Sequence, residues 1–273
     1  DALFALPAAA KRALAIALSP HYRGHSEMYN ERDWREQVHF GRELPAVRGS
    51  EPFWRLQGPN LWPADAAWRE RMLEYMAAVE AIGARLVAVL AGAFGLDAAP
   101  WFGPSPYVLM KGIGYHAQTT AGERRRGVAA HLDFSLVTLT LQDAVGGLEV
   151  QRPDGTWTAV VPEPGTWLVN VGELLQFATG GRLVATPHRV VNPSMARRRV
   201  SIPVFVNPSL TTTLRPELPP VPVGRGAGEH VHAVLAGDRT APLHFGAAEW
   251  RRKGENAWCG VCAGDGNHRI AAT

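Results

Sequence analysis

The sequence predicts a mainly β domain with flanking helices (class α+β), and three observations support this class. Between Tyr107 and Val206, short apolar runs rich in β-branched residues recur about every ten residues, separated by turn signals such as Pro153-Asp154-Gly155. Two helical patterns precede these runs. The chain has 273 residues, 46% of them hydrophobic, so it can bury a large core without a disulfide or a structural metal. Short strands at this spacing are typical of a sandwich, a jelly roll or a barrel.

Residues 1–100 are expected to form a mainly helical support region. Pro7–Leu18 is rich in alanine and begins with a proline, which suits the first turn of a helix. Pro20–Pro63 predicts irregular structure with one or two short strands. From Asp65 to Phe94, apolar residues recur every three to four positions, as on one face of an amphipathic helix; they are Met72, Tyr75, Met76, Val79, Ile82, Leu86, Val89 and Leu90.

Residues 101–210 are expected to form the β core, and residues 211–273 a C-terminal tail of loops and weak helix. Pro216–Gly228 is rich in proline and glycine, which favours a loop. No internal repeat or linker divides the chain, so we expect a single domain over residues 1–273. The predicted strands are Tyr107–Met110, Val137–Leu141, Gly147–Gln151, Thr156–Val161, Thr166–Val171, His188–Val191 and Val200–Val206.

The charge pattern argues against a nucleic-acid partner. Lys and Arg number 28 against 25 Asp and Glu, a net charge of +3. The basic runs at 124–126, 197–199 and 251–253 are short and scattered, and none reaches the block length of a polyanion-binding tail. We therefore expect a small-molecule substrate and no nucleic acid; the sequence leaves the oligomeric state open.

Cysteine content and hydropathy exclude two further classes of protein. The two cysteines, Cys259 and Cys262, are too few for a disulfide-rich secreted scaffold, and their CxxC spacing lacks the second pair that a zinc site needs. The most apolar stretch, Ala77–Phe94, is interrupted by Glu80 and Arg85, so no membrane span is expected. A cytoplasmic location is the expectation that follows.

The first candidate site is the His131-Leu132-Asp133 motif, directly before a predicted strand. In an extended segment residues i and i+2 point to the same side, so the imidazole and the carboxylate converge on one space. A lone motif of this kind is common on protein surfaces. His188, at the start of another apolar strand, supplies a second imidazole, although a lone strand histidine is usually a hydrogen-bonded core residue.

Arg199 and Ser201 form the other candidate pair. They share one face of the strand that ends near Val206, and a planar guanidinium beside a hydroxyl is a good receptor for a carboxylate. Two histidines and one carboxylate that leave coordination positions open form the facial triad typical of non-haem Fe(II) oxygenases. A closed tetrahedral site lacks these open positions.

These motifs carry a family resemblance. The stretch from Gly127 to Pro208 closely resembles the isopenicillin N synthase-like branch of the Fe(II)/2-oxoglutarate-dependent dioxygenases. A looser match reaches back through Tyr22–His25 and Asp33–Gln37. The motifs that stand in the family's order are HxD at 131–133, LTLQD at 139–143, GGLEV at 146–150, PGTWLVNVGELLQ at 164–176, HRVVNP at 188–193 and RxS at 199–201.

The resemblance implies a double-stranded β-helix, or jelly-roll, core with helices outside. It also implies Fe(II), O₂ and 2-oxoglutarate as a cosubstrate, with oxidative decarboxylation coupled to hydroxylation, desaturation or cyclisation of a small molecule such as an amino acid or a specialised metabolite. By motif, His131, Asp133 and His188 are similar to the catalytic iron ligands. Arg199 and Ser201 look like the partners of the distal carboxylate of 2-oxoglutarate. Tyr115 stands where the family has a tyrosine that reaches the same carboxylate, although His116 replaces the usual proline.

Two other functions remain open at this point. One is a 2-oxoglutarate-independent Fe(II) oxidase or cyclase of the isopenicillin N synthase type, in which Arg199 and Ser201 would hold a carboxylate of the substrate itself. The other is a catalytically silent metal-binding protein on the same fold. Succinate release per turnover separates the first from the leading hypothesis, and O₂ consumption separates the second.

Substrate contacts are predicted from position alone. Lys111 shares a strand face with Tyr115, so an inward Tyr115 implies an inward Lys111 that needs a counter-charge, for example from an anionic substrate. A strand-end lysine that reaches solvent is the alternative. Phe134 and Phe177 are candidates to line the substrate site or simply to fill the core. Arg23 and Trp62 belong either to the closure of that site or to the scaffold.

The start of the chain carries one further expectation. The sequence begins with Asp1 rather than Met, and members of the family usually have another strand and helix before the segment that matches Leu6-Pro7-Ala8. We expect that this N-terminal strand and helix are missing from the sequence.

Overall fold

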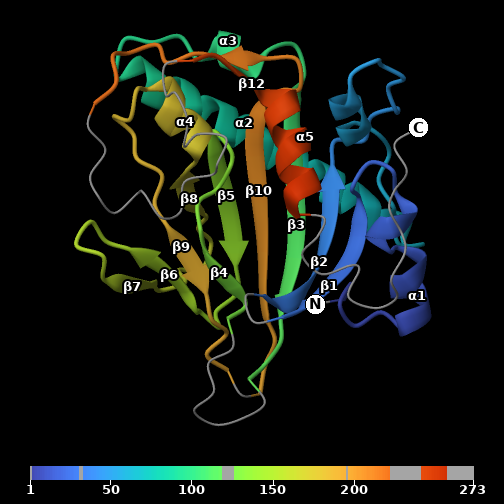
Figure 1. Cartoon of the computed structure of the whole chain (residues 1–273). Coiled ribbons are helices and arrows are strands. Elements are labelled where there is room, and N and C mark those ends of the chain that lie inside the picture. Colours follow the sequence, from blue (N-terminus) through green and yellow to red (C-terminus); the bar gives the residue numbers. More distant parts are fainter. Residues whose placement is uncertain (1, 31–32, 119–125, 195, 222–240, 257–273) are drawn as a thin grey trace.

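The computed structural model describes residues 2–30, 33–118, 126–194, 196–221 and 241–256 (Figure 1). These residues form a six-stranded sheet, a four-stranded sheet and a two-stranded pair, with helices outside the sheets. The predicted class, a mainly β domain with a jelly-roll core and external helices, is confirmed. Cys259 and Cys262 lie outside the described residues.

The major sheet has the strand order β1-β2-β3-β10-β5-β8, and every neighbouring pair is antiparallel. Strands that are distant in the sequence are neighbours in this sheet. β10 lies between β3 and β5, so the centre of the sheet is held by long-range pairing. The strands are β1 (Gly24–Tyr29), β2 (Trp34–Gly41), β3 (Pro106–Tyr115), β5 (Val137–Gln142), β8 (Leu168–Val171) and β10 (Arg199–Ser209).

The minor sheet has the order β4-β9-β6-β7 and is also antiparallel throughout. Its strands are short: β4 (Val128–His131), β6 (Leu148–Gln151), β7 (Trp157–Val160) and β9 (His188–Val190). Gly155, in the tight turn between β6 and β7, has a φ of 85° that suits glycine. The remaining pair joins β11 (Thr213–Leu214) and β12 (Leu243–His244).

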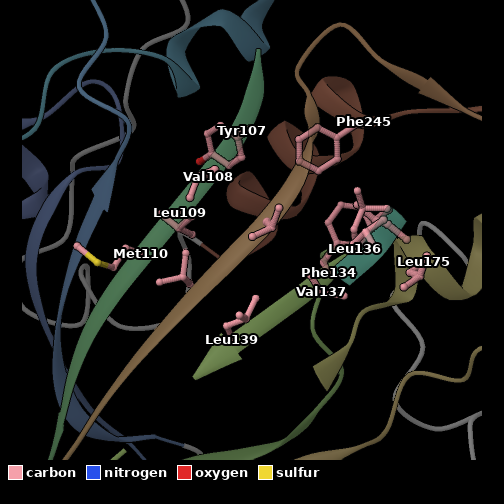
Figure 2. Packing of buried hydrophobic residues seen from close by; sticks show 14 of the residues in the cluster. Tyr107, Val108, Leu109, Met110, Phe134, Leu136, Val137, Leu139, Leu175 and Phe245 are labelled. Atoms are coloured by element: carbon pink, nitrogen blue, oxygen red, sulfur yellow. The ribbon is translucent and has the colours of Figure 1, made fainter. Parts of the chain in front are cut away.

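The helices lie on opposite faces of the major sheet. In Figure 1, α2 (Ala66–Gly92) is behind the sheet and α5 (Phe245–Asn256) in front of it. Phe245 at the start of α5 packs on Phe134 and Tyr107, as Figure 2 shows. The shorter helical elements are α1 (Ala8–Ala13), η1 (Ile16–Leu18), η2 (Pro52–Leu56), α3 (Ala99–Phe102) and α4 (Glu173–Ala178).

The strand register gives the major sheet two chemically different faces. Paired residues share a face, and alternate residues change face. The outer face, towards α2, is almost entirely apolar in its central strands. Its residues are Val38, Phe40, Val108, Met110, Val137, Leu139, Val204 and Val206, several of which appear in Figure 2. The inner face carries polar residues instead: Arg35, Gln37, His39, Lys111, Tyr115, Gln142, Arg199 and Ser201.

Helix α2 covers the outer face. The side chain of Asp65, the predicted first residue of this helical pattern, caps it by accepting a hydrogen bond from the backbone N–H of Trp68. The buried residues of the helix are Met76, Val79, Gly83, Val87 and Ala91. Ile82 and Val89, which the periodicity predicted on the buried face, are exposed, because the close approach is made through the small residues Gly83 and Ala91.

The hydropathy prediction for this region needs a correction. Among the described residues, one helix, α2, is long and apolar enough to cross a membrane, by length and composition alone. Its many alanines outweigh Glu80 and Arg85, the two charges that interrupt the apolar run. In the structure one side of α2 packs on the major sheet, as a helix of a globular core does.

The first hundred residues hold the expected helices, and the one or two short strands predicted for Pro20–Pro63 are also present. The segment Pro20–Pro63 holds two strands, β1 and β2, which extend the major sheet beyond β3. The short strand β4 and the helix α4 were not predicted, since each is only four to six residues long.

Glu36 ties these N-terminal elements to the core. Its carboxylate is 2.7 Å from Nζ of Lys11, 2.8 Å from Nη2 of Arg198 and 3.1 Å from Nε2 of His25. The side chain is 1% exposed. Burial by itself disfavours the charged form, but the hydrogen bonds from His25 and Lys11 and the charge of Arg198 lower the pKa of Glu36 from 4.5 to about 2.

Replacing Gly83 with leucine is expected to lower the free energy of unfolding by about 1–3 kcal/mol. A Cβ at this position would lie 2.8 Å from Cγ2 of Val206 and 3.1 Å from Cδ1 of Leu139. Leucine is the better helix former, so only packing opposes the change. Gly92→Leu, where nothing lies within 4 Å, is the matched control and should be neutral or stabilising in chemical denaturation. Equal losses at both sites would contradict this packing.

The Glu36 cluster predicts a specific acid dependence of stability. Because the folded pKa of about 2 is below the ordinary 4.5, the carboxylate stabilises the fold above pH 4.5, and this contribution is lost as the pH falls towards 2. Glu36→Gln should therefore cost roughly 2–3 kcal/mol at neutral pH and flatten the decline between those values. Thermal denaturation across pH measures this, with the exposed Glu70→Gln as control. A variant that retains the wild-type acid decline would refute the assignment.

Candidate metal centre

The two candidate histidines lie opposite each other in the minor sheet. β4 pairs with β9 so that His131 faces His188, with ring centroids 4.3 Å apart. Nδ1 of His131 is 2.9 Å from the carbonyl oxygen of Ala129, and Nδ1 of His188 is 3.1 Å from that of Thr186. With Nδ1–H donating to a carbonyl, Nε2 carries the free lone pair on each ring. Both Nε2 atoms are therefore available for a metal ion.

Asp133 completes the cluster from the loop after β4. One of its carboxylate oxygens, Oδ1, is 3.7 Å from Nε2 of His131 and 3.6 Å from Nε2 of His188. The three ligand atoms all lie within 4.8 Å of one another. Asp133 is 5% exposed, and Nδ2 of Asn170 on β8 donates to its other oxygen at 3.3 Å. The sequence motif and the distant His188 thus converge on one small volume, as predicted.

The electrostatics of the cluster suit a divalent cation. Burial opposes the charge of Asp133, but His188 and His131 outweigh it and hold its pKa below the ordinary value, so it is a carboxylate at neutral pH. Burial and the neighbouring His188 lower the pKa of His131, which keeps that ring neutral. Burial also opposes the charge of His188, but Asp133 outweighs it and raises the pKa of His188, so a metal ion here would displace a proton shared by these two groups. A neutral imidazole and a carboxylate are the forms that bind metal.

A second polar cluster lies nearby on the inner face of the major sheet. Arg199 on β10 is 1% exposed, and its Nη2 donates to Oε1 of Gln142 on β5 at 3.0 Å. Its Nε and Nη1 are buried and have no hydrogen-bond partner in the described part of the chain. Ser201 is also buried on the same face, and the ring of Tyr115 lies 4.8 Å from the guanidinium of Arg199. Unsatisfied guanidinium atoms beside a hydroxyl fit a carboxylate ligand.

Comparison with known families decides the class of this site. The model of the 2OG-Fe(II) oxygenase superfamily matches residues 107–208, which include both clusters. A second model, described as the non-haem dioxygenase in morphine synthesis N-terminal region, matches residues 1–65. The chain belongs to the 2OG-Fe(II) oxygenase superfamily. Members of this superfamily use Fe(II), 2-oxoglutarate and O₂, and the His131, Asp133 and His188 cluster has the donor set for such a metal.

Curated relatives point the same way. The chain is 34% identical over 223 residues to the 2-oxoglutarate-Fe(II) type oxidoreductase hxnY of Emericella nidulans, covering 74% of this chain and 62% of that protein. It is 32% identical over 225 residues to the 2-oxoglutarate-dependent dioxygenase frbJ of a Dothideomycetidae species, covering 78% and 61%. The chain therefore spans less than two thirds of the length of these relatives.

A solved structure shares the fold. It is a full-length protein of Neurospora crassa in complex with alpha-KG, and it superposes with a TM-score of 0.72 at 24% identity. The match covers 93% of this chain and 80% of the Neurospora chain. At this level of identity the likeness concerns the fold, and it agrees with the oxygenase jelly roll described above.

The remaining predicted site residues of this 2OG-Fe(II) oxygenase fall into two groups. Lys111 lies on the inner face of β3 with Tyr115, as predicted, and its Nζ is 5.1 Å from the ring centroid of Phe205. Phe134 and Phe177 belong to the main hydrophobic core, where Phe134 stacks on Phe245 of α5 (Figure 2). Their contact with a substrate stays a prediction.

Arg23 and Trp62 are scaffold residues. Arg23 donates to the carbonyl oxygens of His21 and Leu56 at 3.0 and 2.8 Å. Trp62 stacks on Phe40 with ring centroids 4.8 Å apart. Both sets of contacts fix loops to the major sheet.

One other group of possible metal ligands occurs among the described residues. His25, Glu27 and Glu36 have ligand atoms within 4.8 Å of one another. The buried Glu36 already contacts Lys11 and Arg198, however, so its charge is balanced by two cations. This group serves the structure rather than a metal ion.

Sequence reasoning missed the residues that support the site. Asn170, which orients Asp133, and Gln142, which holds Arg199, come from strands distant in the sequence from their partners. Both stand inside motifs quoted for the family, so the signal was present, but only the pairing of β5 with β8 and β10 shows which residues they contact.

Asn170→Ala should weaken the binding of a divalent metal about tenfold or more, because outer-shell partners orient the metal ligands. The variant loses the hydrogen bond to Asp133 but none of the three candidate ligands. Calorimetric titration of metal-free protein with Fe(II) under anaerobic conditions measures the change. Val169→Thr, on the opposite face of β8, is the control and should bind as the wild type does. Unchanged affinity in Asn170→Ala would exclude this orienting role.

Proposed function

We propose that this chain is a non-haem Fe(II) dioxygenase that couples oxidative decarboxylation of 2-oxoglutarate to oxidation of a C–H bond in a small molecule. The observation that carries the proposal is the combination of two clusters in one interior. One is the His131, Asp133 and His188 group, and the other is the buried, partly unpartnered Arg199. Family membership supports the same activity.

In this proposal His131, Asp133 and His188 hold Fe(II). Two imidazoles and one carboxylate would hold the ion and would leave coordination positions open for other ligands. Asn170 keeps the carboxylate oriented, and the carbonyl oxygens of Ala129 and Thr186 fix the histidine rings. When bound, the iron supplies the redox chemistry that activates O₂.

Arg199, Ser201 and Tyr115 hold the distal carboxylate of 2-oxoglutarate. Gln142 accepts one hydrogen bond from Nη2 of Arg199, and Nη1 has no partner among the described residues, so the Nη1 and Nη2 end of the guanidinium keeps N–H donors for a ligand. A charge-assisted hydrogen bond from Nη1 suits a carboxylate oxygen. Tyr115 stacks against the guanidinium and restricts its rotation.

Arg199→Met is expected to raise the 2-oxoglutarate concentration required for half-saturation about a hundredfold, because a buried charge-assisted pair is lost. The measurement is the visible charge-transfer band that forms when Fe(II) and 2-oxoglutarate bind under anaerobic conditions. The affinity for Fe(II) alone should not change, since Arg199 contacts none of the metal ligands in the described structure. Arg182→Met, a partly buried arginine that donates to the backbone carbonyls of Thr179 and Pro219, is the charge-matched control.

His131→Ala completes this experiment. It should abolish the band entirely, and the wild type should release succinate when O₂ is admitted. If the wild-type protein binds Fe(II) but forms no band with 2-oxoglutarate, the proposed function is wrong. O₂ consumption without succinate would instead identify a 2-oxoglutarate-independent oxidase.

A further inference from the structure

Strand β2 presents a row of polar side chains to the interior, and each has a buried atom without a hydrogen-bond partner in the described residues. Arg35, Gln37 and His39 alternate along its inner face. Within the described residues no hydrogen bond reaches Nε of Arg35, Oε1 of Gln37 or either ring nitrogen of His39. Gln37 and His39 are 6% and 7% exposed. Buried polar groups in proteins are nearly always hydrogen-bonded, so three adjacent exceptions need a ligand to explain them.

Lys111 stands beside this row. It pairs with His39 across β2 and β3, so the two side chains emerge together on the inner face. Among the described residues its ammonium has only the ring of Phe205 as a partner, at 5.1 Å, and no carboxylate forms an ion pair with it. A partly buried ammonium without a counter-ion is costly unless a ligand supplies the negative charge.

The surroundings of Lys111 add positive charge. Burial is the main reason that its pKa is lowered, and the cations Lys253, Arg35 and Arg252 lower it further. Asp133 of the metal centre opposes this shift, and Lys111 in turn helps to lower the pKa of Glu249 on α5. Glu249 on α5 is already engaged by Arg252 and Lys253. Arg35 is paired with Asp33 at 3.2 Å, so among these cations Lys111 is the one that has no carboxylate at ion-pair distance in the described part of the chain.

The row is separate from the residues assigned to 2-oxoglutarate. Arg199 pairs with Tyr115 across β10 and β3, whereas Lys111 is four residues earlier on β3 and pairs with His39. Four residues of extended strand span about 13 Å. Lys111 is thus a second receptor for negative charge on the same face, and the influence of Asp133 on its pKa places it within electrostatic range of the metal centre.

We propose that Lys111 and His39 bind the carboxylate of an organic monoanionic substrate, while Gln37 accepts a hydrogen bond from an N–H or O–H group of that substrate. The inference rests on the proposed oxygenase function and names the substrate class for that site. One ammonium matches one negative charge, and the apolar contact with Phe205 and the neighbouring Ile113 favours an organic acid over inorganic phosphate. Oε1 of Gln37 can only accept, so the substrate must offer a donor.

The test uses the complete chain loaded with Fe(II) and 2-oxoglutarate under anaerobic conditions. The probes are 4-hydroxybenzoate, indole-3-carboxylate and 3-(4-hydroxyphenyl)propanoate, each compared with its primary amide. Binding is followed as a perturbation of the visible charge-transfer band, and turnover as succinate release after O₂ is admitted. At least one acid should bind about tenfold or more tightly than its amide, as expected for a charge-assisted contact.

Lys111→Met should remove this preference for the acid and leave the 2-oxoglutarate concentration for half-saturation unchanged. Lys111→Arg should keep part of the preference because it retains the charge. Since an unpaired buried ammonium is replaced by an apolar chain of similar length, Lys111→Met should unfold at the same temperature as the wild type or higher. Arg85→Met, an exposed arginine on α2, controls for the loss of one positive charge.

The outcomes separate the two proposals. If the wild type forms no band with Fe(II) and 2-oxoglutarate, the proposed function fails. If the band forms but no acid binds more tightly than its amide, the substrate class is overturned. The same conclusion follows if Lys111→Met prefers acids as strongly as the wild type does.

Discussion

The pairing of β4 with β9 is the constraint on which the rest of the site depends. It sets His131 opposite His188, and a slip of one residue in either strand would turn one imidazole to the other face of the sheet. Asp133 follows β4 by two residues and is then held by Asn170 of the major sheet. The minor sheet therefore supplies the two histidines, and a residue of the major sheet orients Asp133. The geometry of the three candidate ligands depends on how the two sheets pack against each other.

Alternate residues of the major sheet point to opposite faces, so one face stabilises the fold and the other carries the polar groups of the site. Its outer face buries apolar residues such as Val204 and Val206 under α2, and this burial supplies the free energy that holds the strands together. The inner face is then free to carry polar residues whose partners are incomplete, including Arg199 and His39. Groups of this kind destabilise an empty protein, and a ligand recovers the lost interactions. The unsatisfied atoms are thus concentrated where binding can satisfy them.

Much of this arrangement was predictable from local sequence. The alternation in His131-x-Asp133 and in Arg199-x-Ser201, together with the short β runs, predicted the facing side chains and most strands of the core. The family resemblance linked these segments to His188. What local sequence does not contain is the register between distant strands, which decides that Asn170 contacts Asp133. For α2, the apolar period predicted Ile82 on the buried face, whereas the close helix–sheet contact required the small Gly83 there.

The spacing of the two cationic receptors has a consequence for selectivity. The guanidinium of Arg199 is held in one orientation by Gln142 and Tyr115. A planar group that is fixed in this way suits the carboxylate of the proposed cosubstrate, which is the same in every turnover. Lys111 is a flexible point charge over Phe205, and such a group tolerates acids of different shape. In the two proposals each receptor takes one carboxylate, and about 13 Å of strand separates them, so a dicarboxylate as short as 2-oxoglutarate cannot span both. The interior can therefore hold cosubstrate and an acidic substrate together without competition between them.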